Sequence, residues 1–142
     1  MKKEVKLNFL NTPDKEKAYI KKVVNHVHPR TTLTEPEISL TFVSVSYIQE
    51  LNKLYRKKNK PTDVLTFCLN ETAQQLIDIY VSLDTVKQNA RRFKTSLRKE
   101  LAKIIAHAFA HVVGYDHVTD KEYAIMCEYE SFLLKGFNEK II

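Results

Sequence analysis

Three histidines, His107, His111 and His117, fall within the eleven-residue segment HAFAHVVGYDH. The first two are four residues apart in a stretch with helical periodicity, so both imidazoles are predicted to share one helix face, one turn apart. That separation suits two ligands of one tetrahedral metal ion. Gly114 can adopt positive φ, end the helix and turn the chain back, so that His117 supplies a third nitrogen. Three protein ligands leave a fourth position for water, as in catalytic zinc sites.

The histidine pair alone is weak support for a metal site, because a histidine on an apolar helix face is more often a core residue. The glycine and the third histidine strengthen the prediction, since the chemistry requires each of them independently. Imidazole also binds copper, iron and nickel, but zinc is the expected ion, one per chain. His26 and His28 lie two apart and do not share a helix face, so we interpret them as surface or core residues.

Zinc peptidases of the H-E-x-x-H type carry a general-base glutamate after the first histidine. Here that position is Ala108, so a peptidase would lack its proton acceptor. Hydrolysis of a phosphodiester needs less from a protein base when a cation stabilises the developing charge.

Basic residues are concentrated in two short stretches of a chain of net charge +6. Segment 51–60 holds five Lys or Arg and segment 87–103 holds seven, which makes twelve of the 23 in the chain. After residue 104 the balance inverts to three Lys against six acids. Lysines commonly do no more than solvate a helix surface, but two dense runs favour a basic face that binds phosphates.

The periodicity predicts an α+β fold in one domain, residues 1–142, with a small mixed β-sheet backed by helices and the metal site at the end of the long central helix. Strands are expected over 4–10, 37–46, 62–69 and 76–83, the last two forming an antiparallel pair through a loop at 70–75. Helices are expected over 13–28 with Thr12 as N-cap, over 46–58, from the N-cap Asp84 to Phe93, and over 96–113. A last helix is expected to begin with a capping box at Thr119–Glu122 and to run to Lys135.

Several classes of protein are excluded by composition. Only two glycines are present, so the chain has no G-x-G-x-x-G or Walker A loop. Its apolar runs are far shorter than the ~20 residues of a membrane span, and the N-terminus resembles no targeting peptide, so a cytoplasmic protein without a membrane partner is expected. Cys68 and Cys127 are expected to be buried free thiols.

The histidine segment resembles the H-G-x-L-H-L-x-G-Y-D-H signature of the YbeY family, bacterial metalloproteins implicated as endoribonucleases in rRNA maturation. The run LNKLYRKKNKPTDVLTF, Leu51 to Phe67, resembles that family's L-N-x-x-Y-R-x-K-D-x-P-T-D-V-L-S-F, and IDIYVS, Ile77 to Ser82, resembles G-D-I-x-I-S. The likeness spans roughly residues 40–135. This chain departs from the pattern at Ala108, Ala110 and Ile77, among other positions, but keeps all three histidines.

The resemblance implies that the three histidines bind zinc and that Arg56 is the catalytic cation facing the scissile phosphate, for which a planar guanidinium is well suited. It makes Asp63 and Asp78 candidates for supporting or substrate-positioning carboxylates. Tyr115 and Asp116 are expected to shape the turn. Tyr55, which follows Ile48 and Leu51 at helical spacing, fits core packing as well as base stacking.

The leading hypothesis is therefore a zinc-dependent, single-strand-specific endoribonuclease acting on rRNA precursors in small-subunit maturation, with small-subunit ribosomal proteins as further partners. One alternative is a zinc-dependent peptidase. Another is a non-catalytic RNA-binding ribosome-assembly factor with a structural metal.

Overall fold

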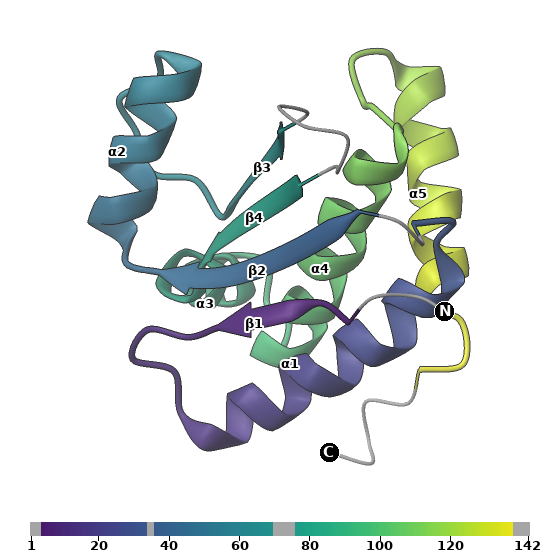
Figure 1. Cartoon of the computed structure of the whole chain (residues 1–142), viewed down its shortest axis with the longest axis horizontal. Helices are drawn as coiled ribbons and strands as arrows, with labels where there is room; N and C mark the ends of the chain where they lie inside the picture. The colour runs from purple at the N-terminus through teal and green to yellow at the C-terminus, as the bar shows by residue number, and fades with distance from the viewer. Residues whose placement is uncertain (1–3, 34–35, 70–75, 138–142) are drawn as a thin grey trace.

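A mixed four-stranded sheet organises the computed structural model, which describes residues 4–33, 36–69 and 76–137 (Figure 1). The strands are β1 (Lys6–Asn8), β2 (Glu37–Val43), β3 (Val64–Leu69) and β4 (Leu76–Ser82). Their order is β1-β2-β4-β3; β2 is parallel to both β1 and β4, and β3 is antiparallel to β4. The predicted antiparallel pair is confirmed, and its connecting loop lies outside the described residues. β3 is consequently an edge strand of this sheet.

Strict alternation along β2 and β4 gives the sheet one buried face, because successive side chains of a strand point to opposite sides. The residues on that face are Ile38, Leu40, Phe42, Ile77, Ile79 and Val81, all at most 4% exposed. Ile77, which occupies a position where the family pattern has glycine, is thus an ordinary core residue. α1 (Asp14–Val27) and α4 (Leu97–Val113) contribute most of the other residues of the same core cluster.

The remaining helices surround this core as the sequence order predicts. They are η1 (His28–Arg30), α2 (Val45–Arg56), α3 (Leu83–Arg92) and α5 (Asp120–Leu134). α4 packs against α1, α3, α5 and β3, which makes it the central helix. α2 contacts β3 and β4, and it lies on the side of these strands away from α5 (Figure 1). The α+β class and the mixed sheet are therefore confirmed.

Two predicted helix caps are wrong by one or two residues. Pro13, not Thr12, is the N-cap of α1, and the Thr12 hydroxyl donates to the Leu10 carbonyl instead. Ser82, not Asp84, caps α3, because its hydroxyl oxygen accepts the Thr85 N–H. The capping box at Thr119–Glu122 is confirmed, and Ser96 is the N-cap of α4, with its side chain accepting the Lys99 N–H.

The two cysteines depart from the prediction, whereas His26 and His28 agree with it. Both cysteines are free, but Cys68 is exposed and Cys127 is half-buried, so their predicted burial is wrong. A ring nitrogen of His26 lies 2.8 Å from the Lys135 carbonyl oxygen, and His28 is buried beside Leu33. Among the described residues, no helix is both long enough and apolar enough to cross a membrane.

Candidate metal centre

The end of α4 brings the three histidines of the sequence motif together. His107 and His111 lie one helical turn apart, with ring centroids 4.6 Å apart. Gly114 then ends the helix with φ +121°, and its N–H donates to the Ala110 and His111 carbonyls. The chain turns back so that the His117 ring lies 5.4 Å from His107 and 5.1 Å from His111. One nitrogen atom of each imidazole lies within 4.8 Å of the others.

This donor set fits a transition metal such as zinc. It consists of three imidazole nitrogens within 4.8 Å of one another, and imidazole is a good ligand for zinc, copper, iron and nickel. Burial, followed by the charges of His107 and His117, lowers the pKa of His111 below its ordinary value of 6.5. The lowered pKa favours the neutral form of His111, whose lone pair can bind a metal.

Glu130, a residue that the sequence analysis did not identify, fixes the first histidine. Its Oε2 atom lies 2.7 Å from Nδ1 of His107, and the Glu130 side chain is only 14% exposed. When Nδ1–H donates to this carboxylate, the lone pair of Nε2 is left for a metal, as in the carboxylate–histidine pairs of zinc sites. A signal was present in the sequence: Glu130 shares a helix face with the buried Met126 and Leu133, where a carboxylate is unexpected.

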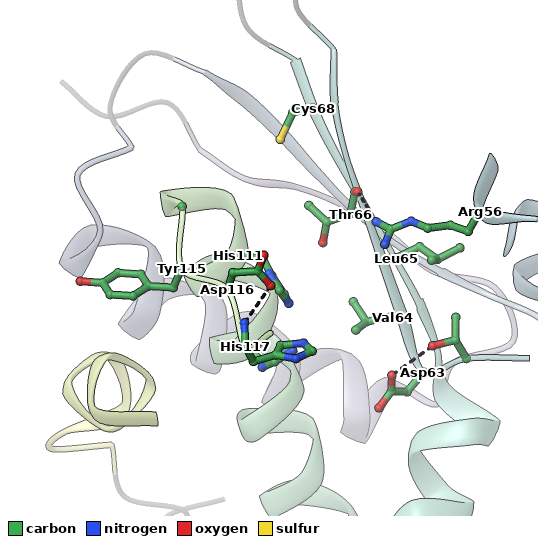
Figure 2. A pocket seen from close by; sticks show the side chains of 13 residues that line it. Arg56, Asp63, Val64, Leu65, Thr66, Cys68, His111, Tyr115, Asp116 and His117 are labelled. Carbon is green, nitrogen blue, oxygen red and sulfur yellow. Dashed lines mark hydrogen bonds between the residues drawn. The ribbon is translucent and has the colours of Figure 1, made fainter. Parts of the chain in front are cut away.

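The turn between the second and third histidines is built by its own residues, as expected. The His117 N–H donates to Oδ1 of Asp116 at 2.7 Å. The ring of Tyr115 stacks on Tyr129 of α5, with centroids 4.3 Å apart. Figure 2 shows Tyr115 pointing away from His111 and His117. These contacts support the prediction that both residues shape the turn.

The histidines form one wall of a cleft of about 540 Å³, and β3 forms the opposite wall. Arg56, at the end of α2, reaches this cleft across the strand edge, and its Nη2 donates to the Thr66 carbonyl at 3.4 Å. Figure 2 shows the guanidinium beside Thr66, across the cleft from His111 and His117. The structure therefore places Arg56 and the three histidines around the same space.

The two candidate carboxylates are separated by the sheet. Asp63 lines the cleft, and its Oδ2 accepts a hydrogen bond from Asn89 at 3.3 Å. Asp78 does not line the cleft, because β4 turns it to the face opposite Ile77 and Ile79. On that face the pKa of Tyr80 is raised, first by burial of Tyr80 and second by the charge of Asp78.

Comparison with known proteins relates this chain to one family. The family model described as Endoribonuclease YbeY matches residues 3–138. The chain belongs to the endoribonuclease YbeY family. A member from Halalkalibacterium halodurans is 37% identical over 124 residues, covering 77% of this chain and 78% of the relative. The Bacillus subtilis member is 34% identical over 118 residues, covering 75% of each.

The fold is also found in a solved structure. The solution structure of TM1509 from Thermotoga maritima matches with a TM-score of 0.57 and 26% identity, covering 92% of this chain and 89% of that one. The resemblance to the YbeY family, which three segments of the sequence carry, is thus confirmed over nearly the whole chain.

Proposed function

We propose that this chain is a zinc-dependent, single-strand-specific endoribonuclease of the cytoplasm, acting on rRNA precursors during small-subunit maturation. Residues 1–142 would function as one metal-dependent hydrolase domain, and small-subunit ribosomal proteins are its further proposed partners. The observation that carries the proposal is one cleft with a histidine triad on one wall and Arg56 on the other. Family membership supports the choice of RNA as substrate.

In this proposal His107, His111 and His117 hold one zinc ion, and Glu130 keeps His107 in the metal-binding tautomer. Bound zinc would act as a Lewis acid at the phosphate and would lower the pKa of water at the site. Ala108, which has no titratable group, occupies the position of the peptidase glutamate, and it is buried in the core at 1% exposure. The peptidase alternative therefore gains no support.

Arg56 supplies the fixed positive charge that the reaction needs. Its guanidinium can donate two parallel hydrogen bonds to phosphate oxygens and does not lose its proton. Its hydrogen bond to the Thr66 carbonyl uses Nη2 and anchors the side chain at the cleft. A cation held in this way stabilises the negative charge that develops on the phosphate in the transition state.

The basic segments extend the cleft into an electrostatic path for the RNA backbone. Lys57 and Lys58, which follow Arg56, are exposed, and so are Arg91 and Arg92 at the end of α3. Contacts between such side chains and phosphates are independent of base sequence, so they would hold many different single strands.

The proposal is tested by cleavage of a defined single-stranded RNA with wild-type, His111→Ala and Arg56→Ala proteins purified in parallel. Wild-type protein is expected to cleave, and both variants are expected to lose most of the activity. Equal cleavage by all three preparations would indicate a contaminating nuclease and overturn the proposal. RNA binding without any cleavage would instead favour a ribosome-assembly factor.

A further inference from the structure

Four aromatic side chains form a connected surface on the sheet face opposite the core. This aromatic surface consists of Tyr47 and Tyr55 of α2, Phe67 of β3 and Tyr80 of β4. The ring centroids of Tyr55 and Phe67 are 5.2 Å apart, those of Phe67 and Tyr80 are 6.0 Å apart, and those of Tyr47 and Tyr80 are 6.3 Å apart. The rings thus form a continuous row from the end of α2 to its beginning.

Core packing does not explain the outer rings of this row. Ile48 holds α2 against the sheet and is fully buried, whereas Tyr55 is 62% exposed and Tyr47 is 49% exposed. The helical spacing of Ile48, Leu51 and Tyr55 therefore does not place Tyr55 in the core. Exposed aromatic faces beside one another are suited to stacking with a planar ligand.

The aromatic surface and the cleft meet at the edge of β3. Thr66 and Phe67 are adjacent in this strand and point to opposite faces of the sheet. Arg56 donates to the Thr66 carbonyl on the cleft side, while the preceding residue, Tyr55, packs against Phe67 on the other side. A strand whose phosphate lies at Arg56 would have a neighbouring base within reach of the Tyr55 ring.

The exposed lysines near this edge favour a nucleic acid over an apolar protein as the ligand of the aromatic surface. Lys53, Lys57 and Lys58 are all exposed at the end of α2, next to Tyr55 and Arg56. Exposed aromatic rings combined with a positively charged backbone path are the features by which proteins hold single-stranded nucleic acid. An apolar protein partner would use the rings but would leave these charges unused.

We propose that the aromatic surface is a stacking site for bases of the single-stranded RNA, next to the phosphate that Arg56 contacts, with Tyr55 as its principal ring. This inference rests on the proposed function for the nature of the substrate. It adds a second binding region, on the opposite face of the sheet, which the metal centre alone does not imply.

The test is the affinity of zinc-loaded protein for a short 2′-O-methyl oligoribonucleotide, confirmed by electrophoresis to remain intact. Tyr55→Leu is expected to weaken binding about tenfold, because stacking on one aromatic ring contributes a factor of this order. Tyr55→Phe keeps the ring and is expected to bind like the wild type. Phe132→Leu is the matched control and is expected to bind like the wild type. Phe132 is 48% exposed and lies beside Arg30, but it belongs to α5 and is not part of the aromatic surface.

Abasic substitutions identify the stacked base. Each position of the oligonucleotide is replaced in turn by an abasic residue, and the loss caused by Tyr55→Leu should disappear at one or two positions. The stacking site would be overturned if Tyr55→Leu bound the intact oligonucleotide as tightly as the wild type does. It would also be overturned if Tyr55→Leu caused the same loss of affinity for every abasic oligonucleotide. Binding and cleavage are measured separately. If Tyr55→Leu binds like the wild type while the wild type still cleaves RNA, only the stacking site is rejected. If Tyr55→Leu weakens binding but the wild type does not cleave RNA, only the nuclease is rejected.

Discussion

His107 depends on a carboxylate from a different helix, and this dependence can be measured. Glu130→Gln keeps the size of the side chain but replaces the charged carboxylate, which accepts the Nδ1–H bond, with a neutral amide. Loss of such a supporting carboxylate typically lowers metal affinity about 10–100-fold, so a loss of that size is expected in competition with a chelator. Glu128→Gln is the control, since Glu128 lies on the same helix and is exposed. Equal zinc affinity of the two variants would show that Glu130 does not support the site.

Arg56→Lys separates charge from geometry at the other wall of the cleft. Lysine keeps the positive charge but lacks the planar pair of donors. We expect RNA binding close to that of wild type and a single-turnover cleavage rate lower by about 10²–10³, the usual effect of losing a contact that acts on the transition state. A wild-type rate in this variant would contradict the two-donor role.

The lowered pKa of His111 predicts a pH dependence of stability in the metal-free protein. Burial, followed by the charges of His107 and His117, places the folded-state pKa below the ordinary 6.5, so the unfolded chain binds more protons as the pH falls. The contribution of His111 is complete above about pH 6.5 and is lost as the pH falls through 6.5 toward the folded-state pKa. The free energy of unfolding of wild type minus that of His111→Asn should therefore be larger at about pH 8 than at about pH 5.5. A difference that does not vary with pH would contradict this account.

At the scale of elements, the turn after α4 decides whether the third histidine reaches the site. Gly114→Ala meets no atom within 4 Å of the added Cβ, so its cost is the strain of φ +121° alone. This strain is expected to lower the free energy of unfolding by about 1–2 kcal/mol and, by shifting His117, to weaken zinc binding. Gly136→Ala, at φ +82° after α5, should cost stability without changing zinc affinity. Urea unfolding and zinc titration of both variants test this, and a Gly114→Ala protein with unchanged zinc affinity would contradict it.

The elements were largely predictable because their signals are local. The histidine spacing, Gly114 and the capping box at Thr119–Glu122 each depend on residues within one or two turns, and the structure places them as predicted. The Ser82 cap was missed because Ser82 and Asp84 are both good capping residues, and the end of β4 decides between them. The contact between His107 and Glu130 joins residues 23 positions apart, so only the packing of α5 on α4 reveals it.

At the scale of the whole molecule, the sheet order brings the two motifs together. β3 lies at the sheet edge, where α2 delivers Arg56 from one side and α4 delivers the histidines from the other. The sequence predicted both groups of residues, but their common cleft depends on the strand order β1-β2-β4-β3, which no local pattern specifies. Asp63 precedes β3 and lines the cleft, whereas the alternation along β4 turns Asp78 to the opposite face of the sheet.

The central claim is tested most directly by the dependence of RNA cleavage on zinc. Wild-type protein is stripped with a chelator, checked by circular dichroism to remain folded, and assayed on single-stranded RNA before and after zinc is returned. The account predicts no cleavage without metal and full recovery at about one equivalent of zinc per chain, as expected for one site with three histidine ligands. Equal cleavage by the stripped and the reconstituted protein would contradict it.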